Sequence, residues 1–66
     1  MANDMRVRDM DSPTLIDRLQ TIARGIRAAG MRTADTVDPE AAEILDVLKG
    51  RCTIRGHRAV SDWVNG

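Results

Sequence analysis

The sequence predicts a small all-α protein, and three observations favour this class. Two stretches carry apolar residues at helical spacing, and each starts with a proline that suits a first helical position. The one short run with strand character has no partner strand elsewhere in the chain. We therefore expect a helical hairpin with a short third helix across its open side. Residues 1–11 are expected to form a flexible N-terminal tail, and residues 12–66 a single helical domain.

The strongest helix signal extends from Ser12 to Gly30. Its apolar residues recur at spacings of four, three, four and three and form one stripe: Leu15, Leu19, Ile22, Ile26 and Ala29. Ser12 can cap the first free backbone N–H groups, and Pro13 suits the first helical position. Gly30 can end the helix in the left-handed conformation, with Met31 folding back against the last turn. We expect this helix to cover about residues 13–29.

A second helix is predicted for residues 39–49. Asp38 can act as its N-cap and Pro39 can occupy its first position, while acidic residues in the first turn suit the helix dipole. Gly50 is expected to end it. The apolar residues again share one face: Ala41, Ile44, Leu45 and Leu48.

The last segment gives the weakest signals. Residues 52–54, which are Cys, Thr and Ile, have some strand character. From His57 onward, Val60, Trp63 and Val64 follow helical spacing, so a short helix is expected over residues 57–64.

The small size of the chain points to association with another protein. A chain of 66 residues buries only about 60% of its unfolded surface, so its core is thin. Cys52 is the single cysteine, which excludes an internal disulfide, and Trp63 is the single aromatic residue. Added stability is therefore expected from a partner subunit, and we expect a homodimer.

Charge is balanced overall but segregated along the chain. Ten basic and ten acidic residues give a net charge of zero, so there is no general attraction to nucleic acid or membranes. Residues 34–48 contain five acids and no base. Such segregation most often means that segments neutralise one another, so Arg18 and Arg27 are expected to reach Glu40 and Glu43.

No apolar run is long enough to span a membrane, and the polar N-terminus does not resemble a signal peptide. With one cysteine, a cytoplasmic setting is expected.

The sequence offers no catalytic, cofactor or metal site. Cys52 and His57 lie five residues apart across a glycine, and nothing enforces the contact that an activated thiolate needs. Glu40, Glu43 and Asp46 follow helical spacing, which is typical of a solvated helix face. The glycines lack the spacing of a phosphate-binding loop. We expect a protein that is not an enzyme and binds no cofactor.

The C-terminal string RAVSDWVNG, residues 58–66, resembles the end of the recognition helix in Cro- and repressor-like helix-turn-helix domains. The resemblance covers nine residues. The positions of the small helix residue and the turn glycine in that family hold Gly50 and Ile54 here, so the turn does not match. The resemblance implies a small DNA-binding regulator that uses its C-terminal helix. Four basic residues are the candidates for phosphate contacts: Lys49, Arg51, Arg55 and Arg58.

The preferred hypothesis is a non-enzymatic accessory protein, regulatory or inhibitory, that binds a protein partner. Two capped amphipathic helices with apolar residues outside their main faces favour this class. The candidate anchors are Trp63, because buried aromatic side chains dominate interface energies, and the apolar residues Val47 and Met31, which lie outside the main helix faces. DNA binding through the C-terminal segment is the alternative.

Overall fold

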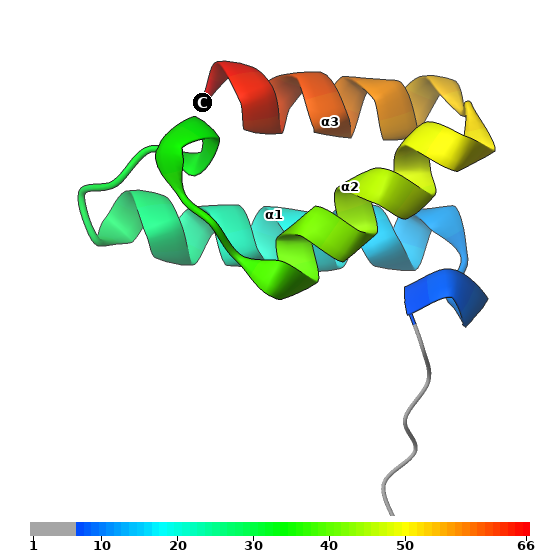
Figure 1. Ribbon diagram of the computed structural model, residues 1–66, viewed down its shortest axis with the longest axis horizontal. Coiled ribbons are helices and arrows are strands. Elements are labelled where there is room, and N and C mark those ends of the chain that lie inside the picture. Colours follow the sequence, from blue (N-terminus) through cyan, green and yellow to red (C-terminus); the bar gives the residue numbers. More distant parts are fainter. Residues whose placement is uncertain (1–6) are drawn as a thin grey trace, which may run out of the picture.

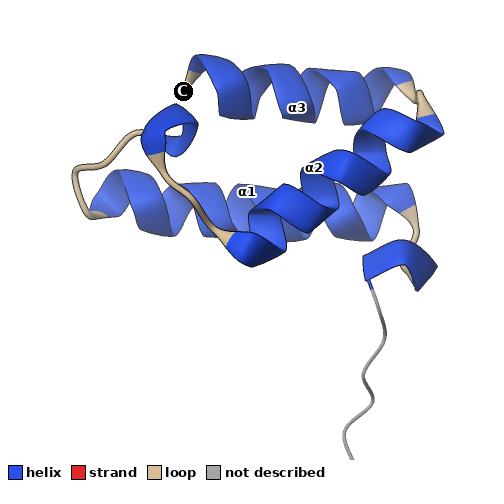
Figure 2. Cartoon of the chain, viewed as in Figure 1, coloured by secondary structure: helices blue, strands red, loops and turns tan. Residues whose placement is uncertain are grey.

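The computed structural model describes residues 7–66, and every regular element in this range is helical (Figure 2). Three α-helices are joined by short connections: α1 (Ser12–Ala28), α2 (Pro39–Arg51) and α3 (Ile54–Asn65). Two 3-10 turns precede and follow α1: η1 (Val7–Asp9) and η2 (Thr33–Asp35). The predicted all-α class is confirmed.

The three helices all contact one another. Figure 1 shows α1 and α3 side by side and running in the same direction, with α2 crossing in front of them on a diagonal. The third helix was expected to be short, but α3 has 12 residues and α2 has 13. The fold is therefore a three-helix unit in which α3 contributes as fully as α2.

The core lies where α2 and α3 meet α1. Its buried apolar residues are Val7, Leu15, Leu19, Ala23, Ala41, Ile44, Leu48, Ala59 and Trp63. Within α1 the buried line has a spacing of four, whereas the predicted stripe alternated between four and three. Ile22 and Ile26 lie half-buried at the edge of this line, and Ala29 is exposed. The stripe was therefore predicted in the right region but centred too far toward α2.

The start of α1 differs from the prediction and its end agrees with it. Asp11, not Ser12, occupies the N-cap position, and its side chain makes no capping hydrogen bond. At the other end Gly30 is left-handed, with a φ of 79°. The amide of Gly30 donates to the carbonyl of Arg27 at 2.9 Å, and that of Met31 donates to Ile26 at 3.1 Å. These two bonds form a Schellman motif, which turns the chain back over the last turn.

The predicted N-cap of α2 is confirmed, but its predicted end is wrong. The Asp38 carboxylate accepts a hydrogen bond of 2.9 Å from the amide of Ala41. The helix does not stop at Gly50; it continues to Arg51 and ends at Cys52, which is left-handed with a φ of 53°. A non-glycine residue in the left-handed conformation costs about 1 kcal/mol. Gly50 was therefore the more conventional candidate than Cys52 for the residue that ends α2.

The start of α3 was also placed too late. Thr53 is the N-cap, and its hydroxyl accepts a hydrogen bond of 3.0 Å from the amide of Gly56. The amide of His57 donates to the carbonyl of Thr53 at 2.9 Å, which closes the first turn. Residues 52–54 are therefore a helix connection and cap, not a strand. The buried residues of α3 are Gly56, Ala59 and Trp63, while Val60 is half-buried and Val64 is exposed.

Part of the expected N-terminal tail is packed on the domain. Val7 in η1 is 9% exposed, and Met10 packs against the core. The guanidinium of Arg51 donates to the carbonyl of Arg8 at 3.0 Å and to the Ser12 hydroxyl at 3.2 Å, so it joins the end of α2 to the start of α1. The remaining residues of the expected tail, 1–6, lie outside the described residues.

Among the described helices, none combines the length and the apolar character needed to cross a membrane.

We expect Leu19→Asp to unfold the protein. Leu19 is 2% exposed and contributes to the core beneath both neighbouring helices. An aspartate there would bury a charge without a partner, at a cost of several kcal/mol, in a domain with a thin core. Circular dichroism should show loss of helical signal. Gln20→Asp, on the exposed side of the same helix, is the control and should retain it. Native helicity in the Leu19 variant would mean that this line is not the core.

We expect Gly50→Ala and Cys52→Gly each to stabilise the fold. Gly50 lies inside α2, and a Cβ there would meet nothing within 4 Å, so alanine should gain about 0.5–1 kcal/mol in helix propensity. Glycine at Cys52 removes the strain of the left-handed backbone. Urea unfolding should report both gains. Gly30→Ala is the contrasting control and should destabilise, because Gly30 is left-handed. A loss of stability in the Gly50 variant would place the end of α2 at Gly50.

Candidate functional site: an apolar face and an arginine-lined groove

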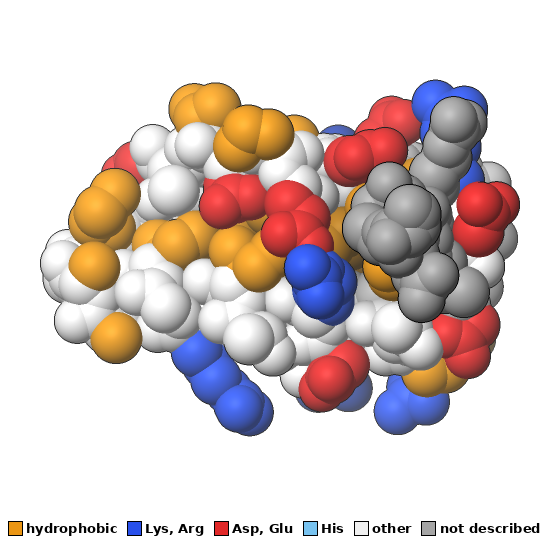
Figure 3. Space-filling view, turned by 90° about the horizontal axis from the view of Figure 1, so that it is seen from below, with side chains coloured by type: hydrophobic (Ala, Val, Ile, Leu, Met, Phe, Trp, Pro, Cys, Tyr) orange, Lys and Arg blue, Asp and Glu red, His pale blue; other side chains and the backbone are white. Residues whose placement is uncertain are grey.

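The first candidate surface is an apolar face on the side where α1 meets α2. Its members are Ile22, Ile26, Met31, Val37 and Leu45. Met31 is 53% exposed and Val37 is 94% exposed, while the other three are half-buried and pack against the core. Figure 3 shows hydrophobic side chains gathered over the left half of this side of the molecule, with charged side chains toward the centre and right.

Local structure holds the exposed members of the apolar face in place. The Schellman hydrogen bond from Met31 to Ile26 fixes the chain directly after α1. Val37 immediately precedes Asp38, whose side chain caps α2. Between them, the Thr36 hydroxyl donates to the carbonyl of Arg32 at 2.7 Å. The two exposed apolar residues therefore flank a connection that is bonded at both ends.

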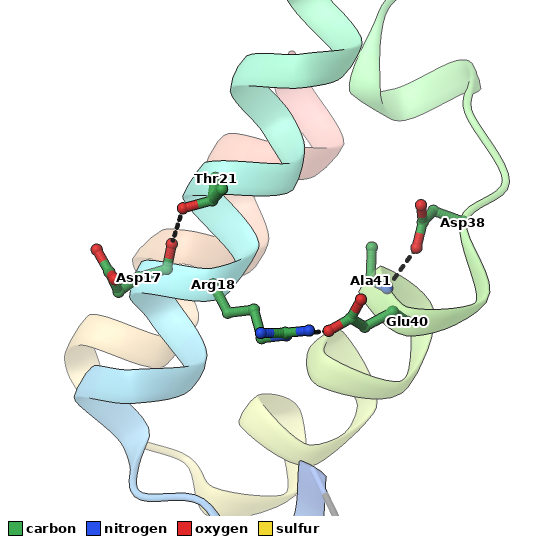
Figure 4. Close-up of polar contacts among 6 residues, drawn as sticks. All are labelled: Asp17, Arg18, Thr21, Asp38, Glu40 and Ala41. Atoms are coloured by element: carbon green, nitrogen blue, oxygen red, sulfur yellow. Dashed lines mark hydrogen bonds and ion pairs between the residues drawn. The ribbon is translucent and has the colours of Figure 1, made fainter. Parts of the chain in front are cut away.

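An ion pair borders the apolar face. The Arg18 guanidinium donates to the Glu40 carboxylate and connects α1 to the first turn of α2 (Figure 4). This hydrogen bond raises the pKa of Arg18 above its ordinary value. The side chains are 53% and 39% exposed, so the pair defines the relative position of the helices more than it stabilises them. One half of the predicted pairing is thus present. Arg27 and Glu43 form no ion pair within residues 7–66.

The predicted partner anchors occupy three different environments. Trp63 is 7% exposed and belongs to the core, and its carbonyl accepts a hydrogen bond of 2.8 Å from the hydroxyl of the buried Thr33. Val47 is half-buried against the core. Met31 is the one of the three that is exposed, and it lies in the apolar face.

The second candidate surface is a groove between α1 and α3, which we call the α1/α3 groove. The part of the groove beside Trp63 has a volume of about 270 Å³ and is lined by residues of these two helices alone. Further hollows continue it toward the start of both helices. The floor is apolar: Ile16, Leu19, Ala23, Ala59 and Trp63. The walls are charged: Asp17, Arg24, Arg27, Arg55, Arg58 and Asp62.

The predicted nucleic-acid residues are divided by the fold. Arg55 and Arg58 lie together on one wall of the α1/α3 groove. Lys49 is exposed in the last turn of α2, on neither wall. Arg51 is half-buried and donates hydrogen bonds to Arg8 and Ser12, so its guanidinium already has partners within the chain.

Two arginines of the groove were not predicted as site residues. Arg24 and Arg27 of α1 line the part of the groove beside Trp63, together with Asp62 of α3. Their positions in the sequence, three residues apart and next to the buried stripe, were the available signal. What brings them opposite α3 is the parallel arrangement of the two helices.

Cys52 and His57 lie on different elements of the fold. Cys52 is exposed on the connection between α2 and α3, and its thiol donates to the carbonyl of Lys49 at 3.4 Å. His57 is exposed in the first turn of α3. Within the described residues, no three His, Cys, Asp or Glu side chains cluster closely enough to hold a metal ion.

Comparison of the chain with protein-family models, with curated proteins and with solved structures found no match. The apolar face and the α1/α3 groove are the two candidate surfaces for function.

Proposed function

We propose that this protein is a non-enzymatic accessory protein, regulatory or inhibitory, that binds a protein partner through its apolar face. The observation that carries the proposal is the exposure of Met31 and Val37 near the two ends of the connection between α1 and α2, with the half-buried Leu45 lining one hollow together with Val37. Exposed apolar side chains that gather on one face mark interaction sites more often than scattered ones do.

The geometry of the apolar face supports tight binding at a small size. Both exposed residues follow or precede a capped helix end, so little backbone freedom is lost on binding. Methionine is unbranched and adapts to irregular partner surfaces. The Arg18–Glu40 pair adds a polar rim next to the apolar centre, which is the usual anatomy of an interface.

We place the protein in the cytoplasm. Cys52 is exposed and free, and an exposed free thiol persists best in a reducing compartment.

We expect Met31→Asp combined with Val37→Asp to abolish partner binding while leaving the fold intact. Both side chains are exposed, so the new charges remain solvated in the free protein but would be desolvated in the complex. Tagged protein can be incubated with an extract of the source cells and the captured proteins identified by untargeted mass spectrometry. A specific partner should be captured by the unmodified chain and lost with the double variant.

The matched control for the apolar face is Ile54→Asp. Ile54 is 88% exposed and apolar, but it lies at the start of α3 and outside the face. This variant should capture the same partner as the unmodified chain. Equal loss in both variants would show that capture reflects general hydrophobicity, and equal retention in both would contradict the proposed site. Circular dichroism verifies the fold of each variant.

The alternative function is DNA binding, and one observation favours it: the fold places Arg55 and Arg58 near Arg24 and Arg27 on the two walls of one groove. Four arginines within reach of one duplex backbone would supply salt-sensitive affinity. Against it stand Asp17 and Asp62 on the same walls, which would repel phosphates.

If the alternative holds, Arg55→Glu with Arg58→Glu should abolish retention of duplex DNA. Binding by the unmodified chain should weaken with salt, with a log–log slope of about −0.9 per phosphate contact. Fluorescence anisotropy of a labelled duplex across a salt series measures both quantities. Lys49→Glu with Arg32→Glu, outside the groove, is the control of equal charge. Retention of duplex at about 0.15 M salt that the groove variant loses and the control keeps would favour DNA over a protein partner.

A further inference from the structure

The charges of the α1/α3 groove follow a diagonal pattern. On the α1 wall the acid Asp17 lies toward the start of the helix, while Arg24 and Arg27 lie toward its end. On the α3 wall the order is reversed, with Arg55 near the start and Asp62 near the end. Each wall therefore has one basic end and one acidic end. Because α1 and α3 run in the same direction (Figure 1), the two basic ends lie diagonally opposite each other.

The lining of the groove fixes the register of these charges. Arg55 lies across the groove from Asp17, where both line one hollow together with Pro13 and Ile16. Further along the groove, Asp62 lies across from Arg24 in the part beside Trp63. None of these four side chains forms an ion pair within the described part of the chain. Each wall therefore presents an acid and a base at the two levels of the groove, and both are available to an outside partner.

We propose that the α1/α3 groove is the interface of a homodimer, with a second copy of this chain as its occupant. A two-fold axis along the groove exchanges the two walls and preserves position along the groove. It places Arg55 against Asp17 of the second copy and Arg24 against Asp62 of the second copy. By symmetry each contact occurs twice, which gives four ion pairs between the copies. The apolar floor lies between them, but Leu19, Ala23, Ala59 and Trp63 are only 2–8% exposed, so the ion pairs and the half-buried Ile16 make the contact.

The mixture of charge signs favours a second copy over an anionic ligand. A phosphate backbone would gain from four arginines but would meet two aspartates on the same walls. A second copy gives each of the two aspartates an arginine partner, while Arg27 and Arg58 add no ion pair. Complementary charge across an interface also suppresses wrong partners and fixes the register, which suits a shallow groove with a small apolar floor.

A stable dimer needs only part of the surface of the chain. A standard interface buries about 800 Å² on each partner, which is roughly one sixth of the 4766 Å² exposed by this chain. The α1/α3 side is one of three sides of a three-helix unit. Dimerisation here leaves the apolar face open, because that face is built from α1, α2 and their connection. The two surfaces can therefore be occupied at the same time.

Charge exchange between copies tests the interface. Asp17→Arg with Asp62→Arg makes a groove with basic walls, and Arg24→Glu with Arg55→Glu makes one with acidic residues at both levels. All four residues are exposed, so the fold should be retained. In sedimentation velocity at micromolar concentration the unmodified chain should dimerise. Each variant alone should dimerise at least about tenfold more weakly, because like charges face each other. An equimolar mixture of the two should recover the dimer.

Controls of equal charge separate this interface from general attraction. Asp9→Arg with Asp46→Arg, and Arg32→Glu with Lys49→Glu, change exposed residues that do not line the groove. Each control should dimerise like the unmodified chain. The proposal is overturned if the unmodified chain is monomeric or if the groove variants dimerise normally. It is also overturned if a mixture of the two control variants associates as well as a mixture of the two groove variants. Monomers that bind duplex DNA and lose it with Arg24→Glu and Arg55→Glu would assign the groove to nucleic acid instead.

Discussion

The structure depends on one constraint: a single apolar line on α1 must be shared by two helices. Leu15, Leu19 and Ala23 lie at a spacing of four and are buried where α2 and α3 both pack on α1. The two helices cover the line itself, but they leave the apolar residues on either side of it partly exposed. Ile22 and Ile26 therefore emerge on the α2 side, and Ile16 emerges on the α3 side. The apolar face and the α1/α3 groove are the two flanks of the same helix.

The sequence predicted helix ends best where a residue has a single conventional role at that position. Asp38 at α2 and Gly30 after α1 were found as expected, because each has one conventional role at that position. The prediction failed between α2 and α3, where two signals competed. Gly50 suggested an end that Cys52 provides instead, and the β-branched pair Thr53 and Ile54 suggested a strand. Threonine is common both in strands and at helix N-caps, so the sequence position of Thr53 alone did not distinguish the two. The hydrogen bond from the Gly56 amide to the Thr53 hydroxyl identifies this residue as an N-cap.

The site was harder to predict than the fold because burial and helix direction are tertiary properties. Trp63 was expected as a surface anchor since it is the single aromatic residue, but a core of small aliphatic side chains requires its volume more than a partner does. The α1/α3 groove depends on Arg24 facing Asp62, which no spacing in the sequence reveals. Met31 is the one exposed anchor, although the helix-ending glycine predicted that it would fold back against the last turn of α1.

The thin core connects stability to association. Leu19, Ala59 and Trp63 belong to the core and also line the floor of the α1/α3 groove. These side chains are only 2–8% exposed, so a second copy in the groove would add little to their burial and would act mainly by binding the folded state. Any species that binds only the folded state raises its apparent stability in proportion to the logarithm of its concentration. In the proposed dimer, folding and dimerisation would therefore be coupled, and resistance to unfolding should increase with protein concentration.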